Sequence, residues 1–289
     1  MTSTTELLPA DTSMGAVTLW VADLDAMIRY YHDGIGLKLL SHGESRAVLG
    51  TSDRVIVILE SKPSMKHASP HEAGLFHTAI LFPTQAALAK AVHSVATKYP
   101  GTFTGSADHL VSQAFYFNDP ENDGVELYWD RDRSQWSWVH GSVEMDTLFL
   151  DPNQFLREHL IEGAVDKEKT VGHVHLSVGS IPAAEEFYVK MLGFEKTMNW
   201  GGQALFVSAG GYHHHMAMNT WRSKGAGRRQ LALGLGKVEI KLPESGNVDE
   251  AKERLDFYGL ESRSDSGLLM VEDPWGNTIS LSSTSSSKD

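Results

Sequence analysis

The chain has 289 residues, of which 41% are hydrophobic, and this is enough apolar side-chain material to exclude a mainly disordered protein. There are 25 Lys and Arg residues against 37 Asp and Glu residues, so the formal net charge is −12 and nucleic acids and anionic membranes are poor partners. Cysteine is absent, so disulfides, thiolate metal ligands and a cysteine nucleophile are excluded, and a bound metal would need His, Asp or Glu as ligands.

The N-terminal residues 1–6 carry neither the basic region nor the apolar stretch of a secretory signal. No apolar run approaches the ~20 residues that a membrane-spanning helix needs. We therefore expect a cytoplasmic protein that does not enter a membrane.

One pattern occurs twice in the first half of the chain: an alternating apolar strand, an amphipathic helix and further short strands. The first copy begins with the strand Gly15–Val21, and its helix carries Tyr30 and Tyr31. The second copy begins with the strand Phe76–Leu81 and continues with a helix over about residues 84–98. It ends in a hairpin around Asp119-Pro120, where Gly124 provides turn geometry.

The second half repeats this order. The third copy begins with Gly172–Val178, and its helix carries Phe187 and Tyr188. The fourth begins with Leu231–Leu235, continues with a helix over about residues 248–258, and ends in a hairpin around Asp273-Pro274. Four β-α-β-β-β modules therefore account for the length. We expect an N-terminal domain over residues 1–133 with modules 1 and 2, a linker with helices over 134–170, and a C-terminal domain over 171–289 with modules 3 and 4.

These modules resemble those of the vicinal oxygen chelate superfamily. The resemblance rests on Gly-His-Val-His-Leu-Ser-Val from Gly172, Leu192-Gly193-Phe194 and the Asp-Pro-Glu-Asn-Asp-Gly-Val-Glu-Leu run from Asp119. More narrowly, the chain is similar to the four-module extradiol ring-cleaving dioxygenases related to catechol 2,3-dioxygenase. The resemblance implies an α+β fold in which the four modules form two barrel-like curved sheets.

In that superfamily, a His at the start of a module's first strand and a Glu in its last strand bind a divalent metal. The corresponding first-strand residues here are Ala16, His77, His173 and Leu231 in modules 1 to 4. The last-strand position holds Glu126 in module 2 and Ser280 in module 4. Only modules 2 and 3 together supply two imidazoles and one carboxylate, which is the ligand set of non-haem Fe(II) oxygenases.

The sequence therefore predicts a metal site made of His77, His173 and Glu126, shared by the two middle modules. This requires modules 2 and 3 to pair across the halves of the chain, leaving modules 1 and 4 as a barrel without metal. Such pairing departs from the commonest arrangement in the family.

Three consecutive histidines, His213, His214 and His215, precede an apolar-Ala-apolar step. In the resembling dioxygenases a histidine of this segment lies over the oxygen site, and alignment on Ala217 assigns that catalytic role to His214. On a strand His213 and His215 would share a face opposite to His214. A shift of one residue would transfer the role to His213 or His215, and one of the three could replace His173 as a ligand.

The resemblance also assigns catalytic roles to Tyr116, ten residues before Glu126, and to His109 in the preceding turn. His175 and His215 are expected to line the substrate site. The implied reaction is cleavage of a catechol-type aromatic diol by O2 to a ring-opened semialdehyde acid, with Fe(II) as cofactor and Mn(II) as the alternative. The expected partners are the diol and O2, and a homo-oligomer is possible.

Two other functions remain open. A glyoxalase-like lyase or isomerase of the same superfamily would need a second carboxylate ligand, which Ser280 does not supply. A drug-sequestering protein without catalytic activity would lack a stoichiometric metal.

Overall fold

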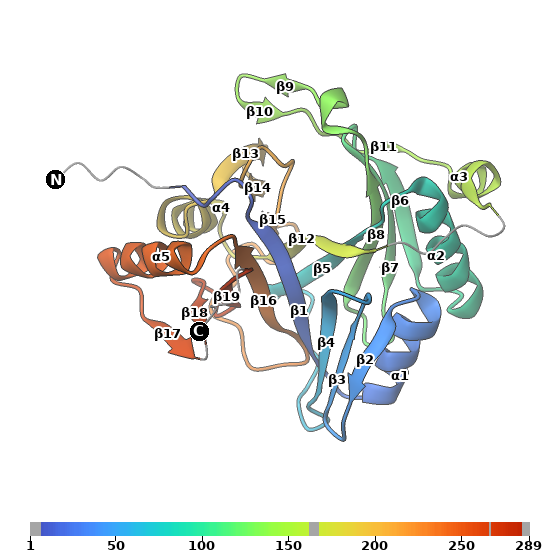
Figure 1. Cartoon of the computed structure of the whole chain (residues 1–289), viewed down its shortest axis with the longest axis horizontal. Coiled ribbons are helices and arrows are strands. Elements are labelled where there is room, and N and C mark those ends of the chain that lie inside the picture. Colours follow the sequence, from blue (N-terminus) through green and yellow to red (C-terminus); the bar gives the residue numbers. More distant parts are fainter. Residues whose placement is uncertain (1–6, 162–167, 266, 285–289) are drawn as a thin grey trace.

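The computed structural model describes residues 7–161, 168–265 and 267–284. They form a mixed α+β fold built from two large curved sheets with helices packed against them (Figure 1). All four predicted β-α-β-β-β modules are present.

The two modules of the first half follow one another directly. Module 1 contains β1 (Ser13–Val21), α1 (Leu24–Arg29), the π-helix η1 (Tyr30–Gly34), β2 (Lys38–His42), β3 (Arg46–Gly50) and β4 (Val55–Ser61). Module 2 contains β5 (Gly74–Leu81), α2 (Gln85–Lys98), β6 (Phe103–Asp108), β7 (Ser112–Asn118) and β8 (Gly124–Asp130).

The modules of the second half repeat this order. Module 3 contains β12 (Thr170–Ser177), α4 (Ile181–Glu185), the π-helix η3 (Glu186–Met191), β13 (Glu195–Trp200), β14 (Ala204–Ser208) and β15 (Met216–Asn219). Module 4 contains β16 (Gly234–Leu242), α5 (Ser245–Phe257), β17 (Ser262–Asp265), β18 (Leu268–Glu272) and β19 (Thr278–Ser283).

The segment between modules 2 and 3 holds more than the expected helices. It contains the short helix η2 (Arg133–Gln135), the strands β9 (Trp138–Val139), β10 (Ser142–Val143) and β11 (Leu148–Phe149), and α3 (Pro152–His159). Strand β11 pairs with β6 and so extends a sheet at its edge. Residues 162–167 of the predicted linker lie outside the described residues.

Each large sheet combines one module from each half of the chain. The nine-stranded sheet has the order β11-β6-β7-β8-β5-β12-β15-β14-β13, and the eight-stranded sheet has the order β17-β18-β19-β16-β1-β4-β3-β2. Modules 2 and 3 meet where β5 pairs antiparallel with β12, and modules 1 and 4 meet where β1 pairs with β16. The predicted cross-half pairing is thus confirmed, while the division into two domains at residues 133 and 171 stays a prediction.

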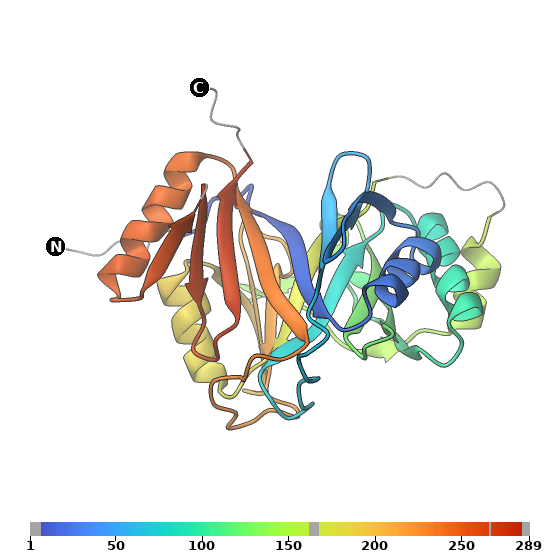
Figure 2. The ribbon, with the colours of Figure 1, turned by 90° about the horizontal axis from the view of Figure 1, so that it is seen from below.

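The helices of each half of the chain lie together, whereas each large sheet contains strands of both halves. Helices α1, α2 and α3 lie on one side of the molecule, and α4 and α5 lie on the other (Figure 2). The starts of several helices are fixed by side chains that accept backbone N–H bonds: Asp23 caps α1, Thr84 caps α2 and Ser180 caps α4.

A buried tyrosine–aspartate hydrogen bond joins the two modules within each half. The hydroxyl of Tyr31 donates to Asp119 at 3.2 Å, and the hydroxyl of Tyr188 donates to Asp273 at 3.0 Å. Each aspartate also accepts two backbone N–H bonds within its Asp-Pro hairpin. The aromatic pairs and the Asp-Pro turns of the sequence pattern are therefore partners, and they fix the hairpin that leads into each last strand.

The expected start of module 4 is wrong. Leu231 is exposed and precedes the strand, because β16 begins only at Gly234. In the paired sheets His173 lies opposite Ala79, as Lys237 lies opposite Thr18. Lys237 therefore occupies in module 4 the position that His173 occupies in module 3.

None of the described helices combines the length and the apolar character that crossing a membrane requires.

Candidate metal centre

Three neighbouring strands at the centre of the nine-stranded sheet carry the predicted ligands. His77 lies on β5, His173 on β12 and Glu126 on β8. On the two strands that flank β5, the residues paired with Ala79 are His173 of β12 and Glu126 of β8. Since residues two apart on a strand share a face, this register directs His77, His173 and Glu126 to the same face of the sheet.

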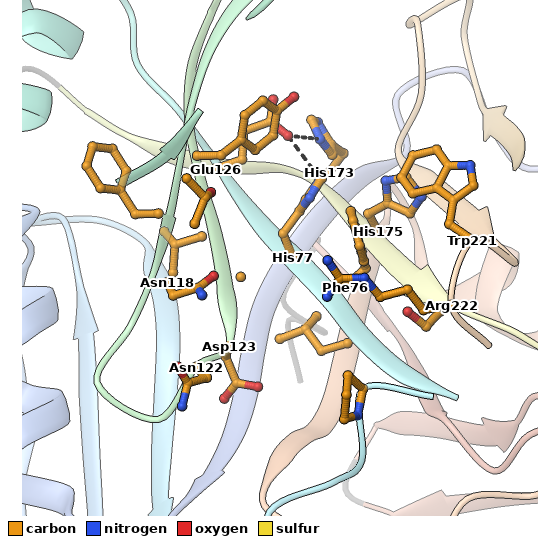
Figure 3. Close-up of a pocket in the computed structure, with 18 of the residues that line it drawn as sticks. Phe76, His77, Asn118, Asn122, Asp123, Glu126, His173, His175, Trp221 and Arg222 are labelled. Carbon is orange, nitrogen blue, oxygen red and sulfur yellow. Dashed lines mark hydrogen bonds and ion pairs between the residues drawn. The ribbon is translucent and has the colours of Figure 1, made fainter. Parts of the chain in front are cut away.

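The three side chains converge on one point. Oε2 of Glu126 lies 2.9 Å from Nε2 of His77 and 3.2 Å from Nε2 of His173 (Figure 3). The candidate ligand atoms all lie within 4.8 Å of one another. Exposure is 2% for Glu126, 6% for His77 and 2% for His173. The predicted set of three is therefore assembled in a buried position.

This cluster fits a divalent metal. Two imidazoles and one carboxylate, arranged on one side, are the donor set of non-haem iron sites that keep open coordination positions. Among the residues that the structure describes, the buried Nε2 of His77 has no hydrogen bond of acceptable geometry. A buried polar atom in this state is costly unless another partner, such as a metal, binds it. The donor set alone does not select Fe(II) over Mn(II).

The pKa shifts of Glu126 and His173 are in the direction that metal binding needs. Burial alone would raise the pKa of Glu126, but the neighbouring His173 and His77 outweigh it and hold this pKa well below its usual value. Burial lowers the pKa of His173 despite the opposing effect of Glu126. An ionised carboxylate beside neutral imidazoles is the form in which these groups bind metals.

Tyr116 and His109 lie together beside the cluster. Tyr116 faces Glu126 directly across the β7–β8 ladder, which explains their separation of ten residues. The Tyr116 hydroxyl lies 2.7 Å from Nε2 of His109, and Nδ1 of His109 lies 2.7 Å from the carbonyl oxygen of Asp146. Because that carbonyl only accepts, Nδ1 donates to it, and in the neutral ring Nε2 accepts the proton of Tyr116. Burial, reinforced by the charge of Glu126, raises the pKa of Tyr116 well above its usual value.

His214 lies next to the cluster, with its ring 4.1 Å from that of His173 between centroids. It lines the same cavity, whereas His213 and His215 do not. Burial, reinforced by the neighbouring histidines, lowers the pKa of His214 well below its usual value. The alignment on Ala217 therefore selects the histidine that faces the cavity.

Asp130 is a residue that the sequence reasoning missed, and its partner His213 was considered there only as an alternative to His214 or as a ligand. Nδ1 of His213 lies 2.7 Å from Nδ1 of His214, and Nε2 of His213 lies 2.9 Å from Oδ1 of Asp130. The second oxygen of Asp130 accepts the hydroxyl proton of Tyr212 at 2.7 Å. Asp130 is the last residue of β8, the strand that carries Glu126, but nothing in the sequence pattern connects it with His213.

Of the two residues expected to line the substrate site, only one lines the cavity. His175 lies opposite His77 across β5 and β12 and lines the cavity, with its Nε2 3.0 Å from Nδ2 of Asn219. His215 lies outside the cavity lining, and its Nδ1 accepts from the backbone N–H of Ala209. Burial lowers the pKa of His215 to about 3. We therefore correct the assignment of His215, whose ring is held by the backbone at the end of β14.

The cluster opens into a cavity of about 1210 Å³. The rings of Phe76, His175 and Trp221 form one wall, with centroids 5.0 to 5.4 Å apart. Asn118, Asn122 and Asp123 lie on the opposite side, away from the three ligands (Figure 3). A flat aromatic molecule fits such a wall, while the polar end leaves room for a substituent.

The eight-stranded sheet lacks an equivalent cluster within the described residues. Its matching positions hold Ala16, Lys237 and Ser280, since Ser280 lies opposite Glu239 as Glu126 lies opposite Ala79. Glu239 is bonded elsewhere: it accepts from the backbone N–H of Ala16 and from Ser282.

Comparison with known proteins agrees with the modules. The family model of the glyoxalase/bleomycin resistance protein/dioxygenase superfamily matches residues 13–127 and 170–281, two segments that each span two modules. The chain is 35% identical to the catechol-2,3-dioxygenase of Bacillus subtilis over 277 residues, which cover 91% of this chain and 94% of that protein.

Two solved structures share the fold. One is a proposed dioxygenase from Bacillus subtilis, with a TM-score of 0.67 and 11% identity over 96% of this chain and 86% of that one. The other is glyoxalase I from Zea mays, with a TM-score of 0.58 and 16% identity over 94% and 92% of the two chains.

Proposed function

The chain belongs to the glyoxalase/bleomycin resistance protein/dioxygenase superfamily, and we propose that it is an Fe(II)-dependent extradiol dioxygenase. It would cleave a catechol-type aromatic diol with O2 to a ring-opened semialdehyde acid. The observation that carries this proposal is the convergence of His77, His173 and Glu126 on one point at the base of an aromatic-walled cavity.

The roles of the residues follow from their contacts. His77, His173 and Glu126 would hold the metal. When bound, Fe(II) supplies adjacent coordination positions for the diol and O2, and it favours the ionised form of the diol. The faces of Phe76 and Trp221 would orient the aromatic ring along the cavity wall.

Proton transfer is assigned to His214. Its ring lines the cavity beside His173, and within the described residues its Nε2 has no hydrogen-bond partner. Nε2 can therefore take the proton that the diol loses on binding and return it later in the reaction. Tyr116 donates its own proton to His109, so its oxygen stays available to accept a hydrogen bond from a diol hydroxyl.

A glyoxalase-like reaction is the second candidate, favoured by the shared fold with glyoxalase I from Zea mays. The single carboxylate of the cluster argues against it, since that type of site needs a second one and the matching position in the other sheet is Ser280. A sequestering protein without catalysis is less well supported, because an intact buried ligand set has no use in it.

The test is to purify the protein anaerobically, load it with Fe(II) or Mn(II), and measure metal content by elemental analysis. Catechol is then added together with O2. We expect about one Fe(II) per chain and a yellow ring-fission product with consumption of O2. Protein that binds no stoichiometric metal would support a sequestering role. Metal-loaded protein that leaves catechol intact but converts a glutathione hemithioacetal would support the lyase.

The cavity is larger than an unsubstituted catechol requires. We propose that the preferred diol carries a substituent that extends toward Asn118 and Asp123. Comparing kcat/KM for catechol with that for ring-substituted catechols tests this, and equal values across the series would contradict it.

A further inference from the structure

A line of hydrogen bonds runs from the cavity away from the metal cluster, through groups that do not line the cavity. It connects Nδ1 of His214 to Nδ1 of His213 at 2.7 Å, and Nε2 of His213 to Oδ1 of Asp130 at 2.9 Å. His213 is fully buried, and the ring of Trp136 packs on it with centroids 5.1 Å apart. The rings of His213 and His214 cannot turn without breaking these hydrogen bonds.

The carboxylate of Asp130 sets the direction of every bond in the line. A carboxylate oxygen only accepts, so Nε2 of His213 must carry a hydrogen and donate it to Oδ1. In the neutral ring Nδ1 of His213 is then an acceptor. Nδ1 of His214 must therefore carry the hydrogen of that bond, which leaves Nε2 of His214 unprotonated.

The other oxygen of Asp130 is occupied independently. Oδ2 accepts the hydroxyl proton of Tyr212, whose own oxygen lies 2.7 Å from the hydroxyl of Tyr128. Both oxygens thus accept from fixed donors, so the carboxylate cannot rotate away from His213. An isosteric asparagine at this position would turn one of the two acceptors into an N–H donor.

We propose that His213 and Asp130 are positioning residues that hold His214 in the tautomer with an unprotonated Nε2 facing the cavity. The proposal rests on the proposed function for its catalytic meaning, because that nitrogen is the one that would take the diol proton. The arrangement follows the same logic as a carboxylate that fixes the tautomer of a catalytic histidine in hydrolases.

The first test does not depend on activity. Metal-free protein labelled with ¹⁵N at its histidines is studied by NMR, and the ring of His214 is assigned by comparison with His214→Gln. We expect Nδ1 of His214 to carry the hydrogen and Nε2 to be unprotonated. A wild-type ring with its hydrogen on Nε2 would overturn the proposal, whatever any variant does.

The second test compares two changes around the same carboxylate. Asp130→Asn should populate the opposite tautomer of His214. Tyr212→Phe removes the bonds to Oδ2 of Asp130 and to Tyr128 but no bond of His213 or His214, so it should leave the tautomer unchanged. In Fe(II)-loaded protein we expect Asp130→Asn to lower kcat by about 10- to 100-fold with unchanged metal content. If Asp130→Asn lowered kcat but kept the wild-type tautomer, the residue would serve packing alone.

The two proposals fail separately. Wild-type protein with the expected tautomer but no cleavage of any catechol would refute the dioxygenase and leave the positioning of His214 intact. Active enzyme in which His214 has the opposite tautomer would refute the positioning of His214 and leave the dioxygenase intact.

Discussion

Nε2 of His173 lies 3.2 Å from Oε2 of Glu126, although the two residues belong to different halves of the chain. Their contact depends on the pairing of β5 with β12, which places both beside Ala79. The candidate metal centre is therefore a property of the cross-half sheet, and neither half contains a complete ligand set.

Removing the carboxylate should abolish metal binding. In Glu126→Ala only two imidazoles remain, and we expect the metal content after anaerobic loading to fall from about one per chain to background. Ser280→Ala is the matched control, because Ser280 holds the same place in the other sheet and should keep its metal. Full metal content in Glu126→Ala would show that the site lies elsewhere.

Removing the imidazole of His214 should separate turnover from metal binding. His214→Ala keeps the three ligands but loses the proton acceptor, so we expect normal metal content and a fall in kcat of about 100-fold or more. Elemental analysis and steady-state O2 consumption measure the two quantities. Loss of the metal in this variant would instead identify His214 as a ligand.

Tyr116→Phe should lower the activity less than His214→Ala does. The hydroxyl that accepts from the diol is lost together with its bond to His109, and a buried polar group left without its partner costs about 1–3 kcal/mol. We expect kcat/KM to fall by about 10- to 100-fold with metal content unchanged. A value equal to that of the wild type would exclude Tyr116 from the reaction.

Stability should depend on pH through Asp123. Burial, together with the charge of Glu121 and against the opposing Arg229, raises the pKa of Asp123 from 3.8 to about 7. Between these values the unfolded chain loses its proton while the folded chain keeps it, so rising pH favours unfolding. The free energy of unfolding falls by at most ~1.4 kcal/mol per pH unit between pH 3.8 and about 7. Above this range the full loss of stability is present.

Asp123→Asn carries no such proton and should lack this contribution. Urea unfolding of metal-free wild type and variant from pH 4 to pH 8 measures it as a difference that grows in favour of the variant. Parallel stability curves for the two proteins would contradict the raised pKa.

Gly172 should not tolerate a side chain. A Cβ at this position would overlap the hydroxyl of Tyr128, next to His173 on β12. We expect Gly172→Ala to lower the free energy of unfolding by about 1–3 kcal/mol. Gly246 on α5 has nothing within 4 Å of such a Cβ, so Gly246→Ala should be neutral or slightly stabilising. Equal stability of the two variants in urea unfolding would contradict this packing.

The sequence was sufficient for the modules and for the assembly of His77, His173 and Glu126, because each repeat presents its ligand position at the same place on a strand. The start of module 4 was misjudged because Leu231–Leu235 is apolar, while the strand that follows alternates between buried residues and half-buried ones such as Lys237. The pattern alone does not tell an apolar loop from the strand beside it.

The link between His213 and Asp130 could not be predicted for a different reason. Strand alternation places His213 and His215 on one face, but the regular strand β15 begins only at Met216. Without the strand, His213 turns toward Asp130 and His215 toward Ala209. Such contacts depend on loop geometry that periodicity does not encode.

The pairing of β1 with β16 and of β5 with β12 also has a consequence during synthesis on the ribosome. The backbone N–H of Ala16 finds its acceptor in Glu239, 223 residues later. Until modules 3 and 4 emerge, β1 and β5 each offer a long unprotected edge to other nascent chains. Closure of such distant contacts is slow, so productive folding of this protein competes with self-association until the last module is translated.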